Sequence, residues 1–289
     1  MFTHGALPCA ANAGRVEDFI VLPASTVGAG DIAARNSEFY DALWSKTYLT
    51  RPERFNTWPL VASLLPQAPS RLEIGPGLRP RLPVRGTHFV DISRPAIARL
   101  GAEGGIARAG RITELPYADA SFDLVAAFDV IEHVENDRQV FAELSRVLKP
   151  DAVLIFSVPL HPAHWNEFDD VVGHARRYRP AELRALIEEQ GLVVARSAVF
   201  GMQANNPVLL HYTVRALSEH RSAAFRCYNW LFFPLGMLLQ KRLKWVDGLA
   251  ELAGVHEILL VCRRRAVGAK PTENEEPAFV GGVPSPRNA

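Results

Sequence analysis

Short apolar runs alternate with stretches of helical spacing through most of this chain. Apolar runs of strand length cover residues 70–74, 87–92, 122–128, 152–158 and 192–200. Stretches with helical spacing cover residues 93–100, 137–148 and 180–190. Strands that are separated by helices favour a parallel sheet, because parallel neighbours need a crossover connection. The pattern therefore predicts an α/β fold.

The two ends of the chain do not show this periodicity. Residues 1 to about 36 are rich in Ala, Gly and small polar residues, and we expect an irregular arm there. Two short helices, broken near Arg51 and Pro52, are expected before residue 65. The tail has four prolines and no apolar periodicity, so we expect it to be disordered. The predicted division is an arm with cap helices (1–65), a main domain (66–265) and the tail (266–289).

The alternation breaks between residues 201 and 254, which are rich in aromatic residues and locally basic. We expect a mostly helical insertion there, acting as a lid or as a dimer surface, before residues 256–263 return as the last strand. The most apolar run, 230–239, is about half as long as the roughly 20 residues of a membrane-spanning helix, so no span is predicted. Basic residues beside this run leave open a peripheral contact with a membrane surface; they are Lys241, Arg242 and Lys244.

Charge and cysteine content narrow the class of protein. The formal net charge is +1, so nothing marks the whole chain as a partner of nucleic acid. Cys9, Cys227 and Cys262 lie far apart without C-x-x-C spacing, which argues against a disulfide framework and against a zinc site. The first residues lack the basic and apolar segments of a secretory signal. We expect a soluble, cytoplasmic protein without a metal ion.

A glycine-containing turn and a carboxylate follow the first two predicted strands. Gly75 and Gly77 would let the backbone approach a ligand at a place where Cβ atoms would collide with it. Asp91 ends the next strand, where a carboxylate can accept hydrogen bonds from a ribose diol. The alternative for Asp91 is a cap at the start of the following helix, since acids commonly take that position. A glycine turn alone is weak evidence, but further signals follow it in order.

Five segments together resemble class I S-adenosylmethionine-dependent methyltransferases. They are LEIGPG (72–77), HFVDIS (88–93), ELPYADASFDLVAAFDVIEHVEND (114–137), RVLKPDAVLIFSVP (146–159) and FDDVVGHARRYRPAELRALIEEQGL (168–192). The last segment resembles the GH-x-RRY segment of one bacterial subgroup. The resemblance covers roughly residues 40–265. It implies a Rossmann-like, doubly wound sheet of seven strands, mostly parallel, whose last strand is antiparallel and follows the helical insertion.

The resemblance also implies a cofactor, S-adenosylmethionine, and positions that bind it. Carried over by position, the cofactor-binding residues are Glu73, Gly75, Pro76, Gly77, Asp91, Arg111, Ile112 and Phe128. Glu73, Gly75 and Gly77 would line the methionine side of the cofactor, together with Phe128. Asp91 would hold the ribose hydroxyls, while Arg111 and Ile112 fall at the adenine contact.

The chain departs from the family pattern in two places. Arg79 stands where the family has a third glycine, and Pro80 and Pro83 follow, which leaves little room for the usual first helix. Arg111 replaces the acid that the family usually places near adenine. These departures keep the ribose and backbone contacts but bring the adenine contact into question.

The loop after residues 152–158 carries candidate groups for the acceptor. A general base is needed only when the acceptor must lose a proton, and the candidates are His164 and then His161. The candidate substrate-binding residues, on this loop and the insertion, are Trp165, His174, Arg177, Tyr178 and Tyr228. Structural alternatives exist for them: a hydrogen-bonded histidine, an arginine clamp on the next helix, or an aromatic core or dimer contact.

The leading prediction is an enzyme that transfers a methyl group from S-adenosylmethionine to an oxygen or nitrogen atom of a small, partly apolar molecule. The acceptor is the expected partner, and a homodimer is left open. One alternative is a catalytically silent protein that keeps the fold for binding or scaffolding, as Arg79 and Arg111 suggest. A second, a nicotinamide-dependent oxidoreductase, is disfavoured because GPGLRP (75–80) lacks the third glycine and the helix start that cradle a pyrophosphate.

Overall fold

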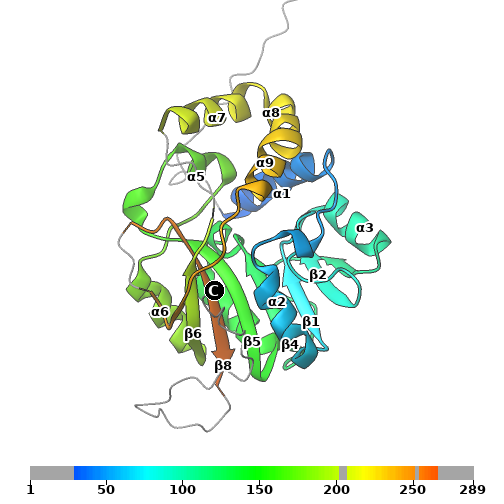
Figure 1. Cartoon of the computed structure of the whole chain (residues 1–289), viewed down its shortest axis with the longest axis vertical. Coiled ribbons are helices and arrows are strands. Elements are labelled where there is room, and N and C mark those ends of the chain that lie inside the picture. The colour runs from blue at the N-terminus through cyan, green and yellow to red at the C-terminus, as the bar shows by residue number, and fades with distance from the viewer. Residues whose placement is uncertain (1–28, 202–206, 251–253, 266–289) are drawn as a thin grey trace, which may run out of the picture.

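The computed structural model describes residues 29–201, 207–250 and 254–265, and its centre is an eight-stranded sheet (Figure 1). The strand order is β3-β2-β1-β4-β5-β8-β6-β7. The strands are β1 (Arg71–Ile74), β2 (Thr87–Asp91), β3 (Ile106–Ala109), β4 (Phe122–Phe128), β5 (Leu148–Pro159), β6 (Leu192–Val199), β7 (Trp245–Asp247) and β8 (Glu257–Arg264). The first five are parallel, and β8 is antiparallel to both β5 and β6. The predicted Rossmann-like sheet with an antiparallel last strand is confirmed.

The sheet has one strand more than the seven that were predicted. β7 is three residues long and pairs antiparallel with β6 at the edge of the sheet. Such a short strand, with two exposed residues, leaves no apolar run in the sequence. β3 at the opposite edge is also mostly exposed, and the apolar pattern did not reveal it for the same reason.

The direction in which strands are added to the sheet reverses at β1. β2 and β3 lie on one side of β1, while β4 and β5 lie on the other. Open α/β sheets bind ligands outside the carboxyl ends of the strands at such a switch point. Gly75 directly follows β1, Asp91 ends β2 and Asp129 directly follows β4, so the fold brings these three residues to the switch point.

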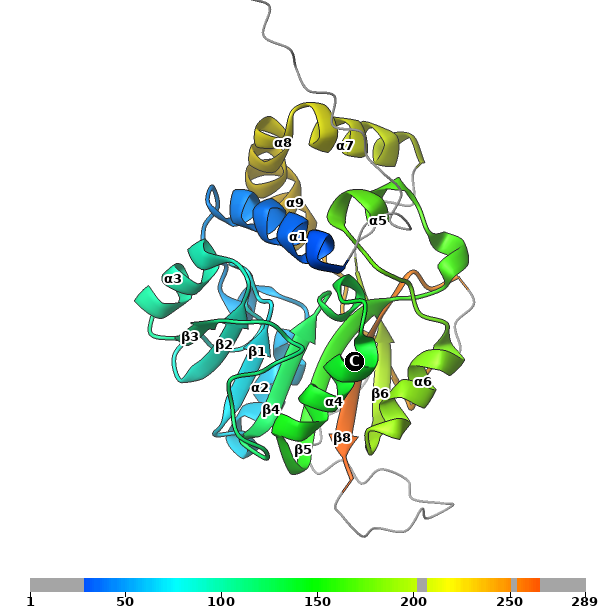
Figure 2. The same cartoon turned by 180° about the vertical axis from the view of Figure 1, so that it is seen from behind.

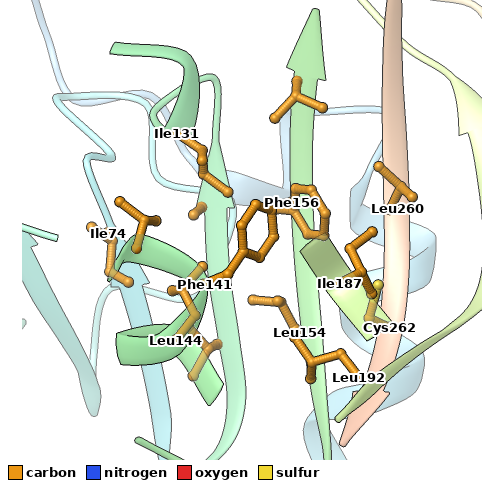
Figure 3. Close-up of a cluster of buried hydrophobic side chains, with 14 of the residues drawn as sticks. Ile74, Ile131, Phe141, Leu144, Leu154, Phe156, Ile187, Leu192, Leu260 and Cys262 are labelled. Atoms are coloured by element: carbon orange, nitrogen blue, oxygen red, sulfur yellow. The ribbon is translucent and has the colours of Figure 1, made fainter. Parts of the chain in front are cut away.

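Helices cover both faces of the sheet. α2 (Trp58–Leu64) packs on one face, while α4 (Asp137–Val147) and α6 (Pro180–Glu189) pack on the other (Figures 1 and 2). The ring of Phe141 on α4 lies edge-on to Phe156 of β5, with ring centroids 5.5 Å apart, inside the larger core (Figure 3). α3 (Arg94–Ala102) runs beside β2 and β3. Burial of this apolar surface is the main stabilising contribution to the fold.

The remaining helices gather at the carboxyl ends of the parallel strands (Figures 1 and 2). They are α1 (Ala29–Trp44), α5 (Glu167–Val172), α7 (Pro207–Glu219), α8 (Arg221–Cys227) and α9 (Phe233–Leu238), with a π-helical turn (Tyr228–Phe232) between the last two. The insertion is helical, as predicted. No helix in the described ranges has the length and apolar character needed to cross a membrane.

The expectation of an irregular arm up to about residue 36 is wrong for its last part, because α1 begins at Ala29. Residues 1–28 and the predicted disordered tail lie outside the described residues. The stretch between β1 and β2 contains no helix, as the prolines predicted.

Candidate active site

The turn after β1 has left-handed backbone at both glycines. The φ angle is +63° at Gly75 and +53° at Gly77, values that side chains with a Cβ rarely adopt. A Cβ on Gly75 would lie 2.5 Å from Cγ2 of Val130, and a Cβ on Gly77 would lie 2.2 Å from Cε2 of Trp44. The protein's own side chains therefore already require glycine at both positions.

Glu73 closes the loop that stands in place of the usual first helix. Its buried carboxylate accepts hydrogen bonds from the backbone N–H groups of Arg81, at 2.8 Å, and Leu82, at 2.9 Å. Burial raises the pKa of Glu73 to about 7, although these hydrogen bonds act in the opposite direction. The carboxylate that the resemblance assigned to the methionine side of a cofactor thus holds the backbone beside the glycine turn.

Asp91 holds two backbone groups at the end of β2. Its Oδ2 accepts from the N–H of Gly77 and its Oδ1 from the N–H of Ser93, both at 2.8 Å. Burial raises the pKa of Asp91 to about 6 against these bonds. A carboxylate has about four lone-pair sites, so each oxygen can still accept a second hydrogen bond. The N-cap of α3 is Ser93, so Asp91 is not the helix cap that the sequence offered as an alternative, and its ribose role stays a prediction.

Helix α1 and the insertion cover the turn from above. Arg79, the residue in place of the third glycine, donates to the Tyr228 hydroxyl at 2.7 Å and to Oδ1 of Asn229 at 2.8 Å. Its guanidinium lies 3.5 Å from the centre of the Phe233 ring and 5.2 Å from that of Trp44. Arg79 thus ties the glycine loop to α9 and α1, and Tyr228, predicted to bind substrate, is one of its partners.

Two open hollows of the described residues are not lined by the glycine turn. One, of about 320 Å³, lies between α1 and α8, and the other, of about 360 Å³, lies along the junction of α7 and α8. The chemistry of the residues at the switch point fits an adenosyl ligand: bare backbone and a ribose-competent carboxylate. The ring of Trp44, on α1, lies against Gly77, and Val130 lies against Gly75.

The remaining predicted cofactor positions lie around the same edge of the sheet. Arg111 is exposed and forms an isolated backbone bridge with Glu114, whereas Ile112 is buried in the larger core. Phe128 is half-buried, and its ring centre lies 6.1 Å from that of Phe200. The adenine contact of the first two residues and the methionine contact of Phe128 stay predictions.

A largely buried polar network joins Glu132 and His133, which follow β4, to the GHxRRY segment (residues 173–178). Nδ1 of His174 donates to Oδ1 of Asp169 at 2.7 Å, and Arg177 pairs with the same carboxylate at 2.9–3.0 Å. Nε2 of His174 faces Oε1 of Glu132 at 3.9 Å. The buried Oε2 of Glu132 has no hydrogen-bond partner, and burial followed by the charge of Asp129 raises the pKa of Glu132 well above its usual value.

His133 is held as a neutral ring in this network. Its Nδ1 lies 3.1 Å from the carbonyl oxygen of Gly173, so Nδ1 carries the proton and Nε2 accepts from the Tyr40 hydroxyl at 3.1 Å. Burial, and then the neighbouring His174, lowers the pKa of His133 to about 3.

Glu132, His133 and His174 form the one set of three possible metal ligands that the described residues bring within 4.8 Å of one another. The sequence predicted no metal ion, because its cysteines lack the spacing of a zinc site, and His174 lies far along the chain from Glu132 and His133. The second ring nitrogens are held by Asp169 and Gly173, as in many metal sites. However, the Tyr40 hydroxyl lies on the nitrogen of His133 that a metal would need. The hydrogen bonds of the two rings therefore favour a polar network over a metal site at this position.

The predicted bases His161 and His164 belong to a second group of imidazoles. The ring of His164 stacks on His256 with centroids 4.3 Å apart, and His161 lies 5.3 Å from His164. Burial, and then the charges of His256 and His161, lowers the pKa of His164. The nearby Trp165 donates to Asp170 at 3.2 Å. Their predicted chemical roles stay predictions.

Tyr178, predicted to bind substrate, packs in the core. Its side chain is buried in the larger core, and its backbone N–H donates to the carbonyl of Pro159 at 2.9 Å. The neighbouring Arg176 pairs with Asp137 at the start of α4. The two arginines, Arg176 and Arg177, therefore hold α4 and α5, and the clamp on the following helix stays a prediction.

Several residues of this edge were missed by reasoning from sequence. Arg81 is half-buried with its guanidinium 3.6 Å from the centre of the Phe55 ring, and burial lowers its pKa to about 10. Glu257 is buried, and burial followed by the charge of Asp129 raises its pKa. The position of Asp129 directly after β4 could have identified it. Arg81 and Glu257 lie far apart in the sequence, and no local pattern around either residue indicated a role at this edge.

Comparison with known proteins yields a family match over part of the chain. Residues 79–156 match a family model described as a methyltransferase domain. A probable S-adenosylmethionine-dependent methyltransferase of Mycolicibacterium smegmatis is 38% identical over 89 residues, which cover 30% of this chain and 35% of the relative. A ubiquinone biosynthesis O-methyltransferase of Hahella chejuensis is 42% identical over 82 residues, which cover 25% of this chain and 34% of that relative.

The chain thus spans about a third of the length of these two relatives. Among solved structures, a SAM-dependent methyltransferase from Thermotoga maritima aligns with a TM-score of 0.49 and 17% identity, over 74% of this chain and 89% of that one.

Proposed function

Because the chain carries a methyltransferase domain whose relatives depend on S-adenosylmethionine, we propose that it transfers a methyl group to an oxygen or nitrogen atom of a small, partly apolar molecule. The observation that carries the proposal is the meeting of two features at the switch point of the sheet. Backbone without side chains follows β1, and the Asp91 carboxylate at the end of β2 accepts a hydrogen bond from Gly77 in that same turn.

These residues would divide the work of holding the cofactor. Asp91 would accept hydrogen bonds from the ribose hydroxyls, and the turn from Gly75 to Gly77 would pack against the amino-acid part. Glu73 would act through the backbone, because its carboxylate holds the far end of the loop. When bound, the cofactor supplies an electrophilic methyl group on a sulfonium, so the protein needs chiefly to orient the acceptor.

His174 joins His161 and His164 as a candidate proton acceptor. Asp169 fixes its ring through Nδ1 and leaves Nε2 facing Glu132, the arrangement of an oriented general base. This network follows β4 and β5, whose carboxyl ends border the switch point. An acceptor hydroxyl or amine placed there would give up its proton to an imidazole.

A second candidate function is a catalytically silent protein that keeps the methyltransferase fold. The close contacts of Trp44 and Val130 with the glycine turn favour it, because these side chains account for both glycines without a ligand. The two functions differ in one measurable property, the affinity for the cofactor.

Calorimetry with S-adenosylhomocysteine tests the proposal. The wild-type chain is expected to bind it, and Asp91→Asn to bind about 10-fold or more weakly, since hydrogen bonds to a charged group contribute about 1.5–3 kcal/mol. The 2′,3′-dideoxy analogue should lose affinity for the wild type but show no further loss with Asp91→Asn. Asp119→Asn is the control, because this exposed acid lies outside the switch point.

The analogue series keeps the test meaningful if Asp91→Asn fails to fold. A folded wild-type chain that does not bind S-adenosylhomocysteine would favour the silent protein. Binding of a nicotinamide dinucleotide without binding of S-adenosylhomocysteine would favour the oxidoreductase.

A further inference from the structure

The helix formed by α8, the π-helical turn and α9 is apolar on two opposite sides in its second half. Its inward side buries Phe225, Asn229, Phe233 and Met237, spaced four residues apart. Its outward side leaves large apolar side chains exposed; they are Tyr228, Trp230, Leu231, Phe232, Leu235, Leu238 and Leu239. We refer to these seven residues as the apolar face.

The side chains of the apolar face are more exposed than is usual for large apolar residues that lie next to one another. Leu238 is 80% exposed, Leu239 66% and Trp230 63%. Leu231, Leu235 and Leu238 follow the i, i+4, i+7 spacing of one helix side. A helix that is apolar all round is normally buried, and contiguous apolar patches on a surface mark interaction sites. The apolar face therefore marks an interaction site.

Charge identifies the kind of partner. The face runs directly into the exposed basic residues Lys241, Arg242 and Lys244. Residues 207–247 contain six Lys and Arg and only two acids, although the formal net charge of the whole chain is +1. An apolar helix side with a Trp and adjacent Lys and Arg is the pattern of a helix that lies in the interface of an anionic bilayer.

We propose that the apolar face docks the protein on the surface of an anionic lipid bilayer. α8 and α9 would lie along the surface, with the leucines and Trp230 in the interface and the basic residues against lipid phosphates. The proposal does not rest on the proposed function, because the exposed side chains and the charge carry it alone.

The same helix links this surface to the switch point of the sheet. Asn229, on its inward side, accepts from Arg79 of the glycine loop and donates to the carbonyl of Leu43 on α1. One helix diameter, about 10 Å, thus separates the docked surface from the loop. An acceptor that is dissolved in the bilayer would meet the protein beside its candidate active site.

Vesicle sedimentation tests the docking. The wild-type chain is expected to bind vesicles that contain phosphatidylglycerol and to bind phosphatidylcholine vesicles much less. Lys241→Gln and Arg242→Gln should each lower the partition coefficient about 5-fold, because a basic residue near such a surface contributes about 1 kcal/mol. The double variant Leu238→Ser/Leu239→Ser should lower it at least about 10-fold.

Ile106→Ser is the matched control, since Ile106 is an exposed apolar residue on β3, outside the insertion, and its variant should bind like the wild type. Brominated phosphatidylglycerol gives a second readout that does not depend on folding of the polar variants. It should quench tryptophan fluorescence in the wild type, and Trp230→Phe should weaken that quenching while still binding.

Three results would overturn the proposal. The first is absence of binding to anionic vesicles, and the second is equal binding by the wild type and the Leu238→Ser/Leu239→Ser variant. The third is a stable dimer in light scattering that this double variant converts to monomer, which would identify the covering partner as a second copy of the chain.

Discussion

At the scale of single residues, the features that resemble a cofactor motif also have structural duties. Gly77 adopts a left-handed conformation and lies under the ring of Trp44, while Asp91 holds the N–H of Gly77. Each of these residues would be needed even without a ligand. A motif read from sequence therefore identifies a place in the fold more securely than it identifies a bound molecule.

Glu73 should make stability depend on pH in a defined direction. Its pKa is about 7 in the folded protein against an ordinary value of 4.5, so the folded state holds the proton more tightly than the unfolded state. The free energy of unfolding should therefore be highest at low pH and fall as the pH rises from about 4.5 to about 7, by up to about 3 kcal/mol for this group.

Urea unfolding across this pH range measures the effect. Glu73→Gln should lose less stability than the wild type as the pH rises, because the amide does not ionise. Glu188→Gln, at an exposed position on α6, should follow the wild-type profile. Parallel profiles for the wild type and Glu73→Gln would show that Glu73 does not carry this dependence.

At the scale of elements, the GHxRRY segment joins three parts of the fold. Asp169 on α5 holds His174 and Arg177, and the backbone N–H of Ala175 donates to the carbonyl of Glu132 at 2.7 Å. α5 itself begins with a capping box between Asn166 and Asp169. One carboxylate thus fixes both the start of a helix and the orientation of an imidazole.

Asp169→Asn should destabilise the protein strongly. Asp169 and Arg177 have fully buried side chains, and loss of one partner of a buried pair typically costs about 3–5 kcal/mol. The exposed pair of Arg179 and Glu182 offers a control, since Glu182→Gln should cost less than about 1 kcal/mol. Urea unfolding at neutral pH compares the two variants, and a similar small loss in both would show that the buried pair contributes little.

At the scale of the whole molecule, the sheet is covered in two different ways. Its faces are closed by α2, α4 and α6, whereas its carboxyl edge is closed by α1, α5 and the insertion (Figures 1 and 2). The first kind of cover is apolar packing on strands. The second brings buried polar networks over the switch point, where a ligand would have to enter.

The two cysteines of the described residues should differ in reactivity, because one lies in the centre of the sheet and the other on the surface of the insertion. Cys262 is fully buried on β8, between β5 and β6, and burial raises its pKa, whereas Cys227 on α8 is exposed. Iodoacetamide should modify Cys262 at least about a thousandfold more slowly than Cys227, because the centre of the sheet opens only when the protein unfolds. Peptide mass spectrometry follows each site, and similar rates would mean that β8 opens locally.

The sequence by itself determined the class of fold and the positions of its main strands along the chain. Continuous apolar runs such as 122–128 and 152–158 indicate strands that are buried on both faces, and the local sequence alone shows these runs. It also placed Gly75, Gly77 and Asp91 at the ends of strands, because their turn and strand patterns are local as well. The sequence did not predict the edge strands β3 and β7, because a strand with little buried surface contains few apolar residues.

Only the tertiary structure decided which side chains meet over the switch point. Trp44, Arg79 and Asn229 come from separate segments, and no local pattern shows that they share one layer. The same holds for Glu132 and His174, which the fold brings within 3.9 Å. Contacts of this kind depend on how loops and added helices pack on a finished sheet, and that packing is a property of the whole chain.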